Sequence, residues 1–252
     1  MITFVGAGPG DPELLTIKGK KAIDSADIII YAGSLVNPAV LDSAKKDAAI
    51  HNSAYMNLDE VIEVMKEGES KGLKVVRVHT GDPSIYGAIR EQIDMLDGLN
   101  IDSEVIPGVS SFLATAAVLK KEFTLPSKSQ TLILTRMEGR TPVPPKEKLI
   151  DLAKHNTSMV IFLSISFIDE LAATLKEAGY RGTTPVAVVY KATWPDQRVL
   201  IGTVDDIAEK VKASGIERTA LTVVGDFLGD EYELSKLYDR NFTTMFRKGE
   251  SE

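Results

Sequence analysis

The sequence predicts an α/β protein with two α/β domains, the first with a mostly parallel sheet and the second with a mixed sheet. In the first half, apolar runs of strand length alternate with amphipathic helical patterns. In the second half, two strand-like runs stand so close together that only a hairpin can join them. Loops of small residues follow three strands of the first half, at the sheet edge where α/β proteins bind ligands.

The elements of the first half follow from apolar runs and helix-capping signals. Thr16 is a plausible N-cap, and Asn57 with Glu60 three residues later forms a capping-box pattern. Strand–helix alternation of this kind implies a parallel sheet covered on both faces. The predicted strands are Ile2–Val5, Ile28–Tyr31, Lys74–His79 and Ser103–Ile106, and the predicted helices are Thr16–Ser25, Leu58–Glu69, Ile85–Leu96 and one opened by residues 107–111.

The second half begins after a polar connector at residues 119–128, so we predict domains at 1–120 and 121–252. The tail after Phe227 is polar and is expected to be irregular. The predicted strands are Gln130–Thr135, Ser158–Leu163, Pro185–Lys191, Arg198–Ile201 and Ala220–Val224, and the predicted helices are Lys146–Lys154, Phe167–Glu177 and Val204–Val211.

Composition excludes several classes of function. The net charge of −7 argues against a nucleic-acid or membrane-surface partner, since both need a basic face. The chain has no cysteine and three widely separated histidines, so we expect no metal site and no thiol nucleophile. The chain opens directly on a strand pattern, and no apolar run approaches the roughly 20 residues that span a bilayer. We therefore expect a cytoplasmic protein.

The three loops are residues 6–12, 80–87 and 107–111. The first loop lacks the third glycine of the dinucleotide fingerprint and has Asp11 where pyrophosphate would sit, so NAD and FAD are disfavoured. Taken alone, Asp82-Pro83 is also typical of a turn or a helix cap. None of the loops carries a cation, so the pattern suits a neutral or cationic adenosyl ligand that meets bare backbone.

Longer motifs around these loops resemble one family, the tetrapyrrole methylases, which use S-adenosylmethionine to methylate corrin and sirohaem precursors. Val5–Thr16 is similar to the first signature of that family, Thr80–Gly87 to its cofactor loop, and Pro107–Ser111 to its third loop. In the second half, Val186–Arg198 and Ala220–Gly225 resemble later blocks of the family. The resemblance runs from Met1 to about Leu228 and is strongest to the members that act on corrin precursors in cobalamin synthesis.

The resemblance implies that S-adenosyl-L-methionine binds in a cleft between the two domains and leaves as S-adenosyl-L-homocysteine. Leu163 has an alternative interpretation as a core leucine that ends a strand, and Ala192 as an ordinary hairpin residue. The residues at positions that match the cofactor contacts of the family are Pro9, Thr80, Gly81, Asp82, Ile85, Ser110, Ser111, Leu163, Ala192, Ala220 and Leu221.

The implied substrate is a polycarboxylate tetrapyrrole, which needs local cations. Arg136 follows a strand end and carries a guanidinium suited to carboxylates, although a solvated loop arginine is the alternative. Tyr86 would line the substrate pocket with its ring or pack in the core. No catalytic residue is assigned, and Asp82, His51 and His79 are the candidates for a base, His51 on an exposed loop and His79 at the end of a buried strand.

Several functions remain open at this stage. Within the family, the methylated position is that of a corrin precursor or, alternatively, of a uroporphyrinogen-type macrocycle. A methylase relative that acts on protein or RNA and a non-catalytic S-adenosylmethionine-binding module are further alternatives. The negative net charge disfavours RNA, and the intact small-residue loops argue against a decayed site. Members of the family are homodimers, so we expect a homodimer here.

Overall fold

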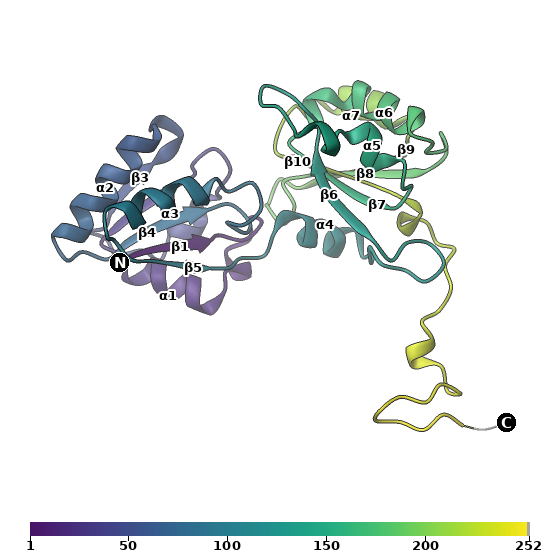
Figure 1. Ribbon diagram of the computed structural model, residues 1–252, viewed down its shortest axis with the longest axis horizontal. Coiled ribbons are helices and arrows are strands. Elements are labelled where there is room, and N and C mark those ends of the chain that lie inside the picture. The colour runs from purple at the N-terminus through teal and green to yellow at the C-terminus, as the bar shows by residue number, and fades with distance from the viewer. Residues whose placement is uncertain (251–252) are drawn as a thin grey trace. The chain divides into compact units, whose positions relative to one another are not determined.

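The computed structural model describes residues 1–250, which form two compact units (Figure 1). The first unit comprises Met1–Val118 together with Lys191–Arg198, and the second comprises Leu119–Tyr190 with the described chain after Arg198. The domains 1–120 and 121–252 stay a prediction, because compactness alone does not show that either part folds independently. Within residues 1–250, no helix has the length and apolar character needed to cross a membrane.

The first unit is built on a five-stranded sheet with the order β3-β2-β4-β1-β5. Every neighbouring pair is parallel, so the carboxyl ends of all five strands meet at one edge. Its strands are β1 (Ile2–Gly6), β2 (Ile28–Tyr31), β3 (Ala49–Asn52), β4 (Val75–His79) and β5 (Ser103–Ile106).

Helices cover both faces of this sheet, as the alternation of apolar runs requires (Figure 1). On one face Ile23 of α1 packs with Val5 and Ile29, and on the other Met65 of α2 and Leu96 of α3 complete a second core. The helices of this unit are α1 (Ile17–Ser25), α2 (Leu58–Ser70), α3 (Ile89–Gly98) and α4 (Ser111–Leu119), the last of which ends at the boundary residue Leu119.

The predicted helix caps of the first unit are confirmed. The Thr16 hydroxyl accepts a hydrogen bond from the Gly19 N–H at 3.0 Å. Asn57 and Glu60 form the reciprocal capping box, with bonds of 2.8 and 2.9 Å. These contacts satisfy N–H groups that a helix start leaves unpaired, which explains why local sequence was sufficient to find both starts.

In the first unit, one strand was missed and one helix start is wrong. Strand β3 was not predicted, because Ala49–Asn52 is a half-exposed edge strand without a continuous apolar run. The third helix starts at Ile89 rather than at Ile85, because residues 83–88 form a tight loop first. The apolar spacing continues backwards from the helix into that loop, so the pattern alone does not show where the helix begins.

The second unit contains a mixed sheet, as predicted, and its strands follow the order β6-β7-β10-β8-β9. Strands β6 and β7 are parallel, and β10 is antiparallel to both β7 and β8. The strands are β6 (Leu132–Arg136), β7 (Ser158–Phe162), β8 (Pro185–Tyr190), β9 (Arg198–Thr203) and β10 (Ala220–Val224), and the helices are α5 (Leu149–Ala153), α6 (Ile168–Glu177) and α7 (Ile207–Ser214).

One core joins the three helices to this sheet, with Leu171 and Leu175 of α6 packed among residues of β7 and β8. The helix predicted at Val204–Val211 begins three residues later, because β9 runs on to Thr203. The Asp206 carboxylate accepts the Thr203 N–H at 2.7 Å, which closes the turn between strand and helix.

Candidate functional site

The three predicted loops lie side by side because they follow three adjacent strands, β4, β1 and β5. Their glycines bring the backbones into direct contact. A methyl group at Gly108 would lie 2.2 Å from the Gly81 carbonyl oxygen, and one at Gly6 would lie 2.6 Å from the Gly108 nitrogen. Gly8 and Gly81 exchange backbone hydrogen bonds of 3.2 and 2.8 Å, and the φ of Gly81 is +58°. Side chains larger than hydrogen therefore do not fit where these loops meet.

Asp82 binds the second loop to the third. One carboxylate oxygen accepts the backbone N–H and the hydroxyl of Ser84, and the other accepts the Gly108 N–H at 2.9 Å. Burial raises the pKa of this carboxyl, but the hydrogen bonds from Ser84 and Gly108 together outweigh burial and lower the pKa. Asp82 thus has the turn-capping role that the sequence left open, and it also connects two loops.

The first loop is covered by the segment Lys191–Arg198, which belongs to the same unit. Trp194 donates from Nε1 to the Pro9 carbonyl oxygen at 2.9 Å. Its ring lies directly over Gly10, where an added methyl group would be 2.1 Å from Cδ1. Tryptophan therefore requires glycine at position 10, and the pair holds the loop closed against the rest of the unit.

Three further polar side chains of this region were not found by sequence reasoning. The Thr193 hydroxyl accepts the Asp11 N–H at 3.0 Å, and the Asn37 amide donates to the Gly10 carbonyl at 2.8 Å. Gln197 accepts the Thr193 N–H at 2.7 Å. One signal was available: the chain has a single tryptophan, and it lies in a polar turn without apolar neighbours in the sequence for so large a ring.

Most predicted cofactor contacts of the first half gather at this edge. Pro9, Gly81 and Ser110 are buried, Thr80 and Asp82 are half-buried, and Ala192 is buried beside Trp194. Ile85 and Ser111 belong to the second and third loops and are half-buried. Tyr86 is 48% exposed, so its alternative interpretation as a core residue is wrong.

The remaining predicted residues lie at one edge of the second sheet. β6 and β7 end there and the antiparallel β10 begins there, which aligns Arg136, Leu163 and Ala220. Leu221 is buried in β10. Leu163 is 61% exposed with a φ of +53°, so it is not a core leucine.

Arg136 organises the loop that follows β6. Its guanidinium donates to the carbonyl oxygens of Met137, Thr141 and Pro142 at 3.2, 3.1 and 2.6 Å. The Met137 N–H in turn donates to the Ser164 hydroxyl at 2.9 Å, which ties the ends of β6 and β7 together. In the structure, Arg136 therefore stabilises its own loop through hydrogen bonds. A direct contact between Arg136 and the substrate stays a prediction.

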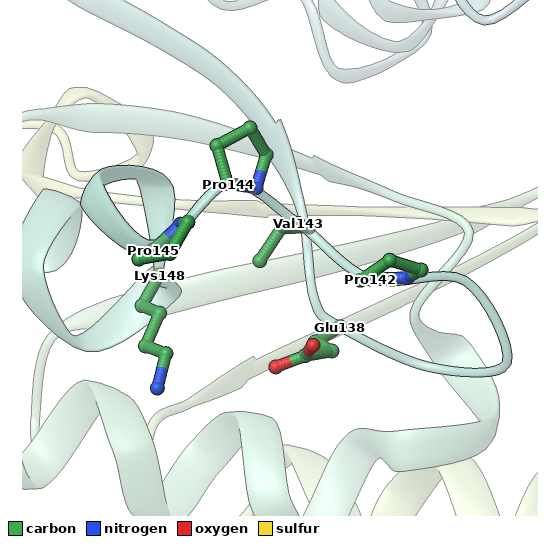
Figure 2. A pocket seen from close by; sticks show the side chains of 6 residues that line it. All are labelled: Glu138, Pro142, Val143, Pro144, Pro145 and Lys148. Atoms are coloured by element: carbon green, nitrogen blue, oxygen red, sulfur yellow. The ribbon is translucent and has the colours of Figure 1, made fainter.

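An open pocket of about 620 Å³ lies beside this loop (Figure 2). Its walls are mostly proline and valine, with one carboxylate and one ammonium group. Lys148 and Glu138 lie on the same side of the proline-rich run (Figure 2). Among the described residues that line this pocket, Lys148 is the one cation, and the Glu138 carboxylate offsets its charge. The lining residues are Glu138, Pro142, Val143, Pro144, Pro145 and Lys148.

Backbone strain is concentrated at these strand ends. Among residues 1–250, ten non-glycine residues have a positive φ, and six of them lie in or next to the segments that carry the predicted site. Each such residue costs about 1–3 kcal/mol and persists only where the surrounding structure holds it, which is typical of binding sites. These six are Tyr86, Ala88, Leu163, Lys191, Thr193 and Thr219.

The histidine candidates for a catalytic base receive no support. His79 is 4% exposed, as expected for the end of a buried strand, and burial together with the charge of Arg77 lowers its pKa to about 3. A ring of such low basicity accepts a proton poorly at neutral pH. His51 lies in the edge strand β3, half-buried, rather than on the exposed loop that we expected. The catalytic base stays unassigned.

Comparison with known proteins agrees with the motifs. The family model of the Tetrapyrrole (Corrin/Porphyrin) Methylases matches residues 1–208. A cobalt-precorrin-4 C(11)-methyltransferase of Methanocaldococcus jannaschii is 61% identical over 98% of this chain and 96% of its own. The crystal structure of a cobalt precorrin-4 methyltransferase is similar with a TM-score of 0.89 and 44% identity, covering 91% of this chain and 96% of that one.

A more distant structure shares the fold. It is the uroporphyrin-III C-methyl transferase of Thermus thermophilus in complex with S-adenyl homocysteine, with a TM-score of 0.76 and 24% identity over 90% of this chain and 93% of that one. The family model covers most of the chain, and the first relative matches almost from end to end. This chain therefore belongs to the tetrapyrrole (corrin/porphyrin) methylases.

Proposed function

We propose that the chain is an S-adenosyl-L-methionine-dependent C-methyltransferase that methylates C-11 of precorrin-4 or cobalt-precorrin-4 in cobalamin synthesis. The observation that carries this proposal is the 61% identity, over 98% of the chain, to an enzyme with that name. The backbone-lined loops of the first unit support it, and so does the presence of Arg136 and Lys148 at or beside the edge of the second sheet.

The three loops of the first unit fit S-adenosyl-L-methionine. None of residues 6–12, 80–87 and 107–111 is lysine or arginine, so nothing in the loops repels a sulfonium cation. When bound, this cofactor supplies an electrophilic methyl group. Interlocked glycines and the Asp82 bridge keep the backbone groups of the loops in fixed positions. We propose Pro9, Thr80, Gly81, Asp82, Ile85, Ser110, Ser111 and Ala192 as its contacts here, with Leu163, Ala220 and Leu221 from the second unit.

The chemistry needs no nucleophilic side chain. An electron-rich carbon of the macrocycle donates its electron pair to the methyl carbon, a C–C bond forms, and the S–CH₃ bond breaks with its electrons retained by sulfur. The macrocycle then releases one proton, which water accepts. The protein lowers the barrier by holding both reactants in line, an effect worth up to roughly 7–11 kcal/mol. The absence of cysteine agrees with a reaction of this kind.

The substrate carries several carboxylates, and we propose that the edge of the second sheet recognises them. Arg136 shapes the loop after β6, and Lys148 offers an ammonium group in the adjacent pocket. Tyr86 presents an exposed ring from the first unit.

We also propose that the protein works as a homodimer, as the family resemblance implies, and sedimentation in solution tests this.

The test has two steps. Calorimetric titration with S-adenosyl-L-homocysteine should give one site per chain with micromolar affinity. The protein is then incubated with methyl-labelled cofactor and, separately, precorrin-4, cobalt-precorrin-4 and uroporphyrinogen III. Label at C-11 of either precorrin form is expected, and the faster form identifies the substrate. Label only in uroporphyrinogen III would support the alternative activity, methylation of a uroporphyrinogen-type macrocycle. Binding of S-adenosyl-L-homocysteine without any methyl transfer would support a non-catalytic binding module.

A further inference from the structure

A buried polar chain connects strand β2 to the start of helix α3. Arg77 of β4 is 6% exposed, and its Nη1 donates to the Ile30 carbonyl at 3.3 Å. Its Nε donates to Oε1 of Gln92 at 3.2 Å. Gln92, 5% exposed, donates from Nε2 to the Ala88 carbonyl at 3.0 Å. The guanidinium can only donate, which fixes the orientation of the Gln92 amide.

The arrangement is expensive for a purely structural contact. Arg77 has no carboxylate partner among residues 1–250, although the loss of water on burial is only partly offset by two neutral acceptors. Burial lowers its pKa to about 10, so the guanidinium still carries its charge at neutral pH. An apolar side chain at position 77 would fill the same space without this cost. The role of Arg77 is therefore sought at the residue where its chain of hydrogen bonds ends.

It ends at a strained residue. Ala88 has a φ of +50°, a conformation unfavourable for any residue with a Cβ, and no side-chain cap begins α3 there. Two residues earlier, Tyr86 has a φ of +54°. Gly87 between them packs so closely that a methyl group would lie 2.1 Å from the Pro83 carbonyl oxygen. Without a restraint, a loop with two such residues would relax.

We propose that Arg77 and Gln92 are positioning residues that hold loop 82–88 in the conformation that receives the cofactor. The loop is then fixed at both ends. Asp82 holds its beginning against Gly108, and the Gln92 amide holds its end at Ala88. This inference rests on the proposed function, because Asp82 and Ile85 are proposed cofactor contacts and Tyr86 is a proposed substrate contact.

The decisive variant is Gln92→Glu, which keeps an acceptor for Arg77 but removes the donor to Ala88. The Kd for S-adenosyl-L-homocysteine should rise about tenfold, as expected for the loss of one well-made hydrogen bond. Hydrogen exchange of amides 83–88 in the ligand-free protein should accelerate. Adding Ala88→Gly to this variant should restore affinity to within threefold, because glycine adopts a positive φ without strain.

Controls separate this role from general destabilisation. Gln130→Glu makes the same chemical change on an exposed residue of the second unit and should change neither readout. If Gln92→Glu does not fold, Gln92→Asn replaces it, since one methylene fewer prevents the side chain from spanning Arg77 and Ala88. Unchanged affinity and exchange in the folded variant would overturn the inference, as would a loss of affinity that Ala88→Gly does not rescue. Failure of the wild-type protein to bind the cofactor product would count against the proposed function, and the exchange data would still judge the role of Gln92.

Discussion

The two units present their strand ends in different ways. At the edge of the first sheet, the loops meet backbone to backbone. Gly6 and Gly108 leave no room for side chains, and Gly81 has a positive φ that favours glycine. At the edge of the second sheet, side chains dominate: Arg136 brackets its own loop, Leu163 projects into solvent, and Lys148 lines an open pocket. The first edge is formed mainly by main chain, and the second mainly by side chains.

This difference agrees with the proposal that the first edge mainly binds the cofactor and the second mainly binds the substrate. A cradle of main chain suits a ligand that never varies, because backbone geometry changes only when the fold changes. An edge made of side chains suits recognition of one macrocycle among related ones, because single substitutions alter its charge and shape. Substitutions that disturb the backbone contacts of the first unit should therefore weaken cofactor binding more than substitutions at the edge of the second sheet do.

Among the variants that test this comparison, Gly108→Ala should have the largest effect on cofactor binding. The added methyl group would lie 2.2 Å from the Gly81 carbonyl, so we expect a stability loss of about 1–3 kcal/mol and no measurable binding of S-adenosyl-L-homocysteine. Gly98→Ala is the matched control, because beyond its own helix backbone and chain neighbours no heavy atom lies within 4 Å of the methyl group there. Calorimetry and thermal unfolding measure both effects. If the Gly108→Ala variant binds S-adenosyl-L-homocysteine with wild-type affinity, the close contact between the loops is not required for cofactor binding.

Asp82→Ala should have the next largest effect. It removes the acceptor of the Gly108 N–H and of two Ser84 donors, bonds to a charged group worth about 1.5–3 kcal/mol. The Kd for S-adenosyl-L-homocysteine should rise between tenfold and a hundredfold. Asp82→Asn, which keeps the shape but places an amide near a donor, should give an intermediate value. An affinity equal to wild type would exclude Asp82 from the cradle.

Acid should destabilise the first unit through His79. The pKa of this ring falls from 6.5 to about 3 on folding, so between these values the unfolded chain binds a proton that the native protein does not. Stability should therefore fall as the pH is lowered from 6.5 towards 3, by up to about 1.4 kcal/mol per pH unit, or about 2 kcal/mol at pH 5. Trp194, the only tryptophan, belongs to this unit and reports its unfolding in urea. His79→Phe preserves the ring beside Phe4 and should lack this part of the slope, whereas an equal slope in both proteins would assign the effect to other groups.

Arg136→Ala should have the smallest effect and should act only on substrate. Loss of three hydrogen bonds to loop carbonyls loosens residues 137–142, so we expect KM for the tetrapyrrole to rise about three- to tenfold. The affinity for S-adenosyl-L-homocysteine should not change. Arg136→Lys should recover part of the loss, since one ammonium cannot reach all three carbonyls. An equal loss of cofactor affinity would contradict the division between the two edges.

Local sequence predicted most of the fold because the signals were local. Ile28–Tyr31 is a continuous apolar run, Ala220–Val224 is apolar except for Thr222, and the caps at Thr16 and Asn57 satisfy the first N–H groups of their own helices. The errors fall where a tertiary contact decides. β3 exists because it adds to an edge of the sheet, and α3 begins only after a tight loop whose end, Ala88, accepts a hydrogen bond from the Gln92 side chain.

The sequence by itself determined two α/β sheets of different kinds, the three loops of small residues and, through their motifs, the family. Each of these depends on residues that are close in the chain. The tertiary structure alone decided that Trp194 closes over Gly10, that Asp82 bridges to Gly108, and that Arg77 reaches Ala88 through Gln92. These contacts join segments that lie up to 185 residues apart, and their energy depends on distances that only strand order and packing set.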